Sequence, residues 1–243
     1  MSTSPKNSSG FPDTRWSLVL AAKDAVSPQG AEALGELCQI YWPPIYFYLR
    51  RRGYSPPDAE DFTQAFFHRL LEKRQFAIVT ECRGRLRSFL LTALKHFLSD
   101  QWDRSQAIKR GGHTSIIAID QVSAEERYAI EPRDDLSPDV LYEKQWARTI
   151  LARILSELRE EQVRAGNETA FEALKDHLGW NAGESTYREP AAALGLTENA
   201  IRLRVMRLRR RYGELLRACI AETVSSEEEL VSEMEHLFRL VRT

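Results

Sequence analysis

The chain has 243 residues with 34 basic and 35 acidic side chains, so its net charge of -1 does not by itself indicate a nucleic-acid or membrane partner. No apolar run is long enough to span a bilayer, and residues 1–10 lack the apolar stretch of a secretory signal. We therefore expect a cytoplasmic protein with a disordered tail over 1–10. The three cysteines are far apart and match no zinc-ligand spacing, so no cofactor or metal is expected.

The near-zero net charge conceals strongly charged blocks. Residues 83–110 hold seven basic and two acidic side chains, and residues 197–212 hold six arginines and one glutamate. Between these blocks, residues 113–143 hold eight acidic and two basic side chains, and residues 222–235 hold six acids and no base. This pattern predicts two basic binding surfaces separated by an acidic connector.

Helical periodicity prevails along the first part of the chain, and no strand pattern is convincing. One helix is predicted at about 14–25 and another from about residue 30. Pro43 and Pro44 should kink or interrupt this second helix, because proline lacks a donor N–H. Ser55 before Pro56 marks the start of a third helix. Its apolar stripe consists of Phe62, Phe66 and Leu70, with Phe67 beside it.

The next predicted helix is long, about 84–109, and is ended by the glycines at 111 and 112. Basic and polar side chains surround an aromatic residue toward its end: Lys95, His96, Ser99, Trp102, Asp103, Arg104 and Gln106. Basic residues interleaved with an aromatic ring suit unstacked bases, because a ring can stack on any base. In the other interpretation, Trp102 and His96 are simply buried and the charges are solvated.

Residues 113–136 are acidic and show no helical stripe, which predicts a linker. Ser137 before Pro138 starts the next helix, and its apolar residues recur at steps of four: Trp146, Ile150, Ile154 and Leu158. Another helix holds Phe171, Leu174 and Leu178, and a last short one covers about 227–241. The predicted fold class is all-α, with two helical domains joined by the acidic linker.

Residues 187–212 predict a helix-turn-helix, with a turn at Gly195 and a second helix that Thr197 can cap. One stripe of the second helix is apolar: Ile201, Val205, Leu208 and Tyr212. The opposite face and its flank carry Asn199, Arg202, Leu203, Met206 and Arg210, with Arg204, Arg207 and Arg211. Such a helix fits the DNA major groove, where arginine binds a guanine edge or a phosphate. The alternative is a solvated basic face on an ordinary packing helix.

These two basic segments occur in an order that resembles the bacterial RNA polymerase sigma factors of the extracytoplasmic-function group, over about residues 30–110 and 140–215. Region two of that family has an acidic start followed by Asp-Leu-x-Gln-x-x-Phe, and residues 58–67 are similar to it. Phe89-Leu90 and Lys95-His96 with Asp100 stand where the family has an aromatic-Leu pair, a spaced Arg-Asn and an Asp. His96 therefore replaces the usual Asn.

Region four of the family has Tyr-x-Glu-Ile-Ala-x-x-Leu-Gly, then Ser-x-x-x-Val-(Lys)-x-Arg-x-x-Arg. The first pattern is matched by Tyr187, Glu189, Ala191, Leu194 and Gly195, and the second by Thr197, Ile201, Arg202, Arg204 and Arg207. Pro190 replaces the apolar residue, so the first helix is expected to start there. The two motifs together, in this order, are much more specific than either motif alone.

The resemblance implies region two at 11–112, a linker at 113–136, region four at 137–221 and an acidic extension at 222–243. It implies core RNA polymerase and promoter DNA as partners; an anti-sigma factor is common in the group, although no residue identifies one. The core-polymerase contacts would be Asp58, Asp61, Gln64 and Phe67. The minus-ten contacts would be Lys95, His96, Ser99, Asp100, Trp102 and Arg104. The minus-thirty-five contacts would be Thr197, Asn199, Arg202, Leu203, Arg204, Met206, Arg207 and Arg211.

The expected function is promoter recognition, promoter melting and transcription initiation by a subunit that is not an enzyme. One alternative is a stand-alone helix-turn-helix repressor or activator that binds a palindrome as a dimer. A DNA-processing enzyme is the other, but no carboxylate cluster, phosphate-cradling glycine loop or paired nucleophile stands out. The charge of the extension also raises the hypothesis that it covers and inhibits the arginine-rich helix.

Overall fold

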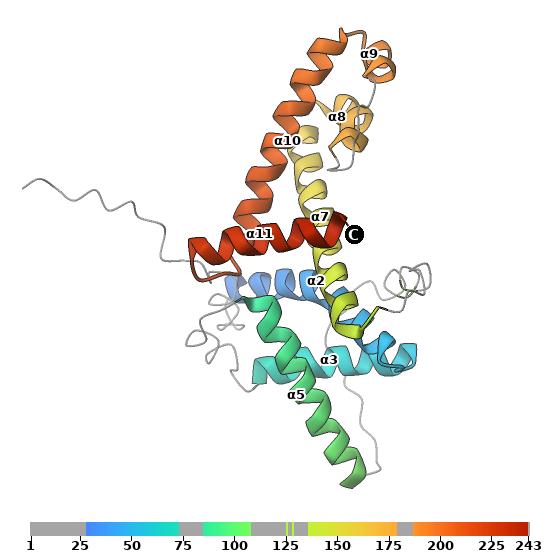
Figure 1. Ribbon diagram of the computed structural model, residues 1–243, viewed down its shortest axis with the longest axis vertical. Coiled ribbons are helices and arrows are strands. Elements are labelled where there is room, and N and C mark those ends of the chain that lie inside the picture. Colours follow the sequence, from blue (N-terminus) through green and yellow to red (C-terminus); the bar gives the residue numbers. More distant parts are fainter. Residues whose placement is uncertain are drawn as a thin grey trace, which may run out of the picture.

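The computed structural model describes residues 28–72, 85–107, 125, 128, 136–178 and 187–242, and these form helices and turns with no strand among them (Figure 1). The all-α prediction is confirmed for this part of the chain. The predicted tail, the helix at 14–25, the glycines at 111 and 112 and most of the linker lie outside the described residues. No helix in the described ranges combines the length and apolar character needed to cross a membrane.

One end of the molecule is built from α2 (Pro28–Arg51), α3 (Pro56–Glu72) and α5 (Leu86–Ala107) (Figure 1). Trp42 of α2 stacks on Phe67 of α3, with ring centroids 6.1 Å apart and the planes nearly parallel. Phe97 of α5 meets Phe66 of α3 edge-on at 5.7 Å. Ser55 caps α3 as predicted, because its Oγ accepts a hydrogen bond from the backbone N–H of Asp58.

The sequence predicts that Pro43 and Pro44 kink or interrupt the second helix. In the structure, α2 continues through both prolines without interruption. Two missing N–H groups should weaken the helix, since the carbonyls one turn earlier lose their donors. The flanking side chains of Trp42, Ile45 and Tyr46 are completely buried against the neighbouring helices. Tertiary packing therefore overrides the local preference of the two prolines.

The longest described helix, α7 (Pro138–Arg164), connects the two ends of the molecule. Ser137 caps it as predicted, and the predicted stripe from Trp146 to Leu158 is buried. Its most extensive packing is with α2, where Arg153 forms an ion pair with Glu36 at 2.6 Å. It also packs against α10 (Glu198–Ala221). Since one helix contributes to both ends, the division into two domains joined by a linker remains a prediction.

The other end of the molecule holds α8 (Glu168–Leu174), η1 (Lys175–His177), α9 (Arg188–Leu194) and the start of α10 (Figure 1). Here α9 begins at Arg188, two residues before the position expected from Pro190. Pro190 is tolerated because N–H groups in the first turn of a helix have no intrahelical partner. The C-terminal helix α11 (Glu227–Arg242) crosses the middle of the molecule and packs on α7 and α10.

Candidate nucleic-acid interface

The helix-turn-helix has the local geometry that the sequence predicts. Gly195 ends α9 in the left-handed conformation, with φ 65° and ψ 32°, which glycine adopts at little cost. Thr197 then caps α10, because its side chain accepts a hydrogen bond from the backbone N–H of Ala200 at 3.2 Å. The predicted stripe of Ile201, Val205, Leu208 and Tyr212 is buried. This burial leaves the opposite face of α10 in solvent.

The outward face of α10 carries polar and apolar side chains of the types that can contact base edges. Asn199 and Arg202 are exposed near its first turn. Leu203 and Met206 are also exposed, to 44% and 59%, although apolar side chains of this size are usually buried. In a major groove, such side chains can contact a thymine methyl group while asparagine or arginine binds adenine or guanine.

The last arginines of α10 are held by other parts of the protein. Arg209 donates two hydrogen bonds, at 3.1 and 2.7 Å, to the carbonyl oxygen of His177. Arg211 binds both carboxylate oxygens of Glu161 on α7, at 2.9 and 2.6 Å, and these bonds raise its pKa further above the ordinary value. The predicted phosphate contact by Arg211 would have to displace this pair, so the structure gives Arg211 a role in packing α10 on α7.

The earlier arginines of α10 lack such partners. Among the described residues, no carboxylate lies within ion-pair distance of Arg202, Arg204 or Arg207. All three side chains are exposed. Arg204 and Arg207 also border a groove of about 390 Å³ whose lining includes Phe171 and Leu174. The cations available to an external anion are therefore concentrated in the first half of α10.

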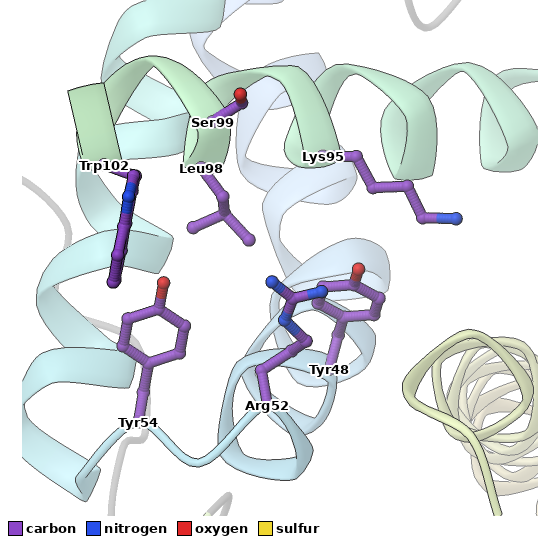
Figure 2. A pocket seen from close by; sticks show the side chains of 7 residues that line it. All are labelled: Tyr48, Arg52, Tyr54, Lys95, Leu98, Ser99 and Trp102. Carbon is purple, nitrogen blue, oxygen red and sulfur yellow. The ribbon is translucent and has the colours of Figure 1, made fainter.

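A second candidate surface lies at the opposite end of the molecule, around a cavity of about 260 Å³ between the end of α2 and the end of α5. Figure 2 shows Trp102 and Tyr54 on one side of this cavity and Arg52 with Tyr48 on the other. The chain reaches this arrangement through Gly53, which adopts a φ of 91° between α2 and α3. Trp102 is 66% exposed, and an exposed indole is a side chain on which a base can stack.

The predicted minus-ten residues gather at this end of α5. Lys95, Ser99 and Trp102 line the cavity, and His96 is exposed beside them. The alternative in which Trp102 and His96 are buried is therefore wrong. The side chain of Arg104 lies outside the described residues.

Two of the charged members of this group are paired within the protein. Lys95 donates to Asp139 of α7 at 2.6 Å, and this hydrogen bond raises the pKa of the lysine. Asp100 pairs with Arg69, whose guanidinium lies over the Phe97 ring. A nucleic-acid phosphate at Lys95 would therefore compete with the Asp139 carboxylate. Both side chains of this pair are about half exposed, so the pair is weakly held.

Sequence reasoning missed the α2 side of the cavity. Tyr48, Arg52 and Tyr54 face α5 but belong to a segment that the sequence identifies only as a basic helix end before a glycine. The signal was present, since Tyr48 and Tyr54 flank the basic run at 50–52, and aromatic residues beside basic ones suit unstacked bases. The missing information was that the turn at Gly53 brings the segment against α5.

The predicted polymerase contacts lie on α3 but do not all reach its surface. Asp58 and Asp61 are exposed, and Gln64 is half-buried one turn further on. Phe67 is buried in the stack with Trp42, so the prediction that its ring contacts a partner is not compatible with this arrangement. Its apolar neighbours on α2 explain the burial, and its role here is to hold α3 in place.

Among the residues that the structure describes, no group of three or more His, Cys, Asp or Glu side chains is placed to hold a metal ion. Comparison of the chain with models of protein families, with curated proteins and with solved structures finds no match.

Proposed function

We propose that the chain is a promoter-specificity subunit of bacterial RNA polymerase, a sigma factor of the extracytoplasmic-function group. The observation that carries this proposal is that exposed basic side chains at the start of α10 and an aromatic, basic cavity at the end of α5 lie at opposite ends of one helical molecule (Figure 1). The start of α10 suits a duplex groove, and the aromatic cavity at the end of α5 suits an unstacked strand. Promoter opening requires both chemistries, whereas a repressor requires only the first.

In this proposal the first half of α10 reads the minus-thirty-five element. Asn199 and Arg202 contact base edges, and Leu203 and Met206 contact thymine methyl groups. Arg204 and Arg207 neutralise phosphates, which positions the helix without reading sequence. The absence of described carboxylate partners around these arginines supports the assignment, because no internal ion pair has to break on binding.

The cavity at the end of α5 captures bases of the minus-ten element. Opening a duplex costs a few kcal/mol per unstacked base. Stacking on an exposed ring such as Trp102 returns about 1–3 kcal/mol per base. Arg52 and Lys95 at the same cavity supply cations for the strand that carries the base. Asp58, Asp61 and Gln64 on α3 form the proposed polymerase contact.

Transcription in vitro tests the proposal. The protein is mixed with bacterial core polymerase on fragmented genomic DNA, and the transcript starts are sequenced, with core polymerase alone as the control. Discrete starts that share two upstream elements are expected. If no start rises above the control while the protein still binds duplex DNA, the stand-alone repressor or activator becomes the better account.

A further inference from the structure

The end of α10 and the start of α5 meet at one junction in the middle of the molecule. The backbone N–H of Leu86 donates to the carbonyl oxygen of Thr223, two residues after the end of α10, at 3.1 Å. Beside this bond, the Arg85 guanidinium donates to Ser232 of α11 at 2.7 Å. Each proposed DNA surface therefore lies at the far end of a helix whose other end is at this junction (Figure 1).

A buried ion pair fastens α11 to the junction. Arg87 of α5 donates to both carboxylate oxygens of Glu233 on α11, at 2.8 and 3.1 Å, and the two residues are 3% and 1% exposed. Arg87 also pairs with Glu143 of α7 and lies over the Trp146 ring at 4.9 Å. One guanidinium therefore connects α5, α7 and α11.

The acidic side chains of α11 do not cover the start of α10. Glu233 binds Arg85 and Arg87, and Glu227 binds Arg217 in the last turns of α10. The proposed base-reading residues lie at the opposite end of that helix. The geometry thus favours a bracing role for α11 over the hypothesis that it screens the arginine-rich face.

Because α5 and α10 are long, a small change of angle at the junction moves their far ends by a large distance. At 1.5 Å per residue, the 24 residues of α10 extend about 36 Å and the 22 residues of α5 about 33 Å. A tilt of about 5° at the junction would move the far end of α10 by about 3 Å. This displacement is close to the rise of about 3.4 Å for one base pair of DNA.

We propose that α11, through the Arg87–Glu233 pair, sets the length of spacer DNA that this protein accepts between its two promoter elements. The inference rests on the proposed function. With α11 in place, the angle between α5 and α10 is fixed and only a narrow range of spacers fits. The two helices placed end to end would span about 70 Å, so the accepted spacer is no longer than about 20 base pairs.

The first test is transcription from promoters whose spacers run from about 12 to about 20 base pairs between constant elements. The wild-type protein, Glu233→Gln and the exposed matched control Glu235→Gln on the same helix are compared with core polymerase. For each protein, transcription from the best spacer is divided by transcription from a spacer one base pair longer or shorter. This ratio should fall about fivefold in Glu233→Gln, which corresponds to a modest coupling free energy between two sites. An unchanged ratio in a folded Glu233→Gln protein would overturn the proposal.

A second measurement does not depend on transcription. Spin labels on cysteines at the exposed positions Ala65 of α3 and Ala193 of α9 report the distance between the two ends. The labelled chain carries Cys82→Ser and Cys219→Ala, and its remaining native cysteine, Cys38, is buried. The distance distribution should be narrow in the wild type and broad in Glu233→Gln. An equally narrow distribution in both would remove the bracing role. A broader distance distribution in Glu233→Gln, combined with no transcription by the wild type or either variant at any spacer, would refute the proposed function. The bracing role of α11 would then still stand.

Discussion

Arg87 and Glu233 are 146 positions apart in the sequence, yet they form a two-point ion pair that is almost entirely shielded from water. The guanidinium fork and the carboxylate match in geometry, so each charge satisfies the other at low dielectric. Burying both charges costs several kcal/mol of hydration, which their attraction offsets only while both are present. Removing one partner should therefore lower the free energy of unfolding far more than replacing both partners with apolar residues.

Removing the carboxylate should strongly destabilise the fold. We expect Glu233→Ala to lower the free energy of unfolding by about 3–5 kcal/mol, because the Arg87 charge is left buried with less compensation. Urea unfolding followed by circular dichroism measures this change. The double variant Arg87→Met/Glu233→Leu should recover most of the loss. A Glu233→Ala effect no larger than that of the exposed control Glu235→Ala would contradict the prediction.

The two classes of arginine on α10 should differ in their effect on DNA binding. Arg202→Ala should weaken binding to the minus-thirty-five element by about 1–3 kcal/mol and relax the preference at one base position, because a bidentate base contact is lost. Arg209→Ala is the matched control, since its guanidinium is held by the His177 carbonyl. Fluorescence anisotropy across a set of duplexes measures both. An equal loss of affinity on every duplex sequence would indicate that Arg202 contacts a phosphate and not a base.

Trp102→Ala should impair promoter opening more than promoter binding. We expect a loss of about 1–3 kcal/mol from the lost stacking of one base, with Trp102→Phe retaining part of it. Permanganate reactivity of unpaired thymines in the polymerase complex reports opening directly. Ser88→Ala, at an exposed position near the other end of α5, serves as the control. Normal opening by Trp102→Ala would exclude the ring as a stacking platform.

We expect His236 to make the stability of the junction sensitive to mild acid. Burial, and then the nearby Arg87 cation, lower the pKa of His236 below its usual value of 6.5, although Glu143 and Glu233 act in the opposite direction. The unfolded chain therefore takes up the proton first as pH falls. The stability associated with neutral His236 is present above about pH 6.5 and is lost as pH falls through the lower pKa of the folded state.

The variant His236→Gln should remove this part of the pH dependence. Urea unfolding measured between about pH 7.5 and pH 5.5 compares its slope with those of the wild type and of the exposed control His96→Gln. The wild type and His96→Gln should lose stability toward the acid side faster than His236→Gln. Parallel slopes for all three proteins would show that His236 does not titrate in this range.

Local signals in the sequence predicted local structure well. Serine or threonine before a helix start identified the caps at Ser137 and Thr197, because capping depends only on neighbouring backbone groups. The four-residue recurrence of apolar side chains likewise predicted which face of α10 is buried. Both features are fixed within a few residues of chain.

Features that depend on distant segments could not be predicted in the same way. The prolines of α2 break a helix in isolation, but burial of their neighbours keeps this one continuous. Phe67 looks like an exposed motif residue until Trp42 is placed against it. Similarly, an acidic C-terminal segment could pair with any basic block, and only the fold selects Arg87 rather than the start of α10.

The arginines of α10 fall into an exposed group and an anchored group, and this difference affects how the DNA specificity of the protein can evolve. Arg202, Arg204 and Arg207 are exposed and have no carboxylate within ion-pair distance among the described residues, and substitutions at such positions usually alter stability by only a few tenths of a kcal/mol. Arg209 and Arg211 anchor the helix to neighbouring segments, so their substitution should destabilise the fold more. Duplicated copies of this gene could thus acquire new target sequences by mutation of these exposed positions while the buried and anchored residues of α10 keep the scaffold intact.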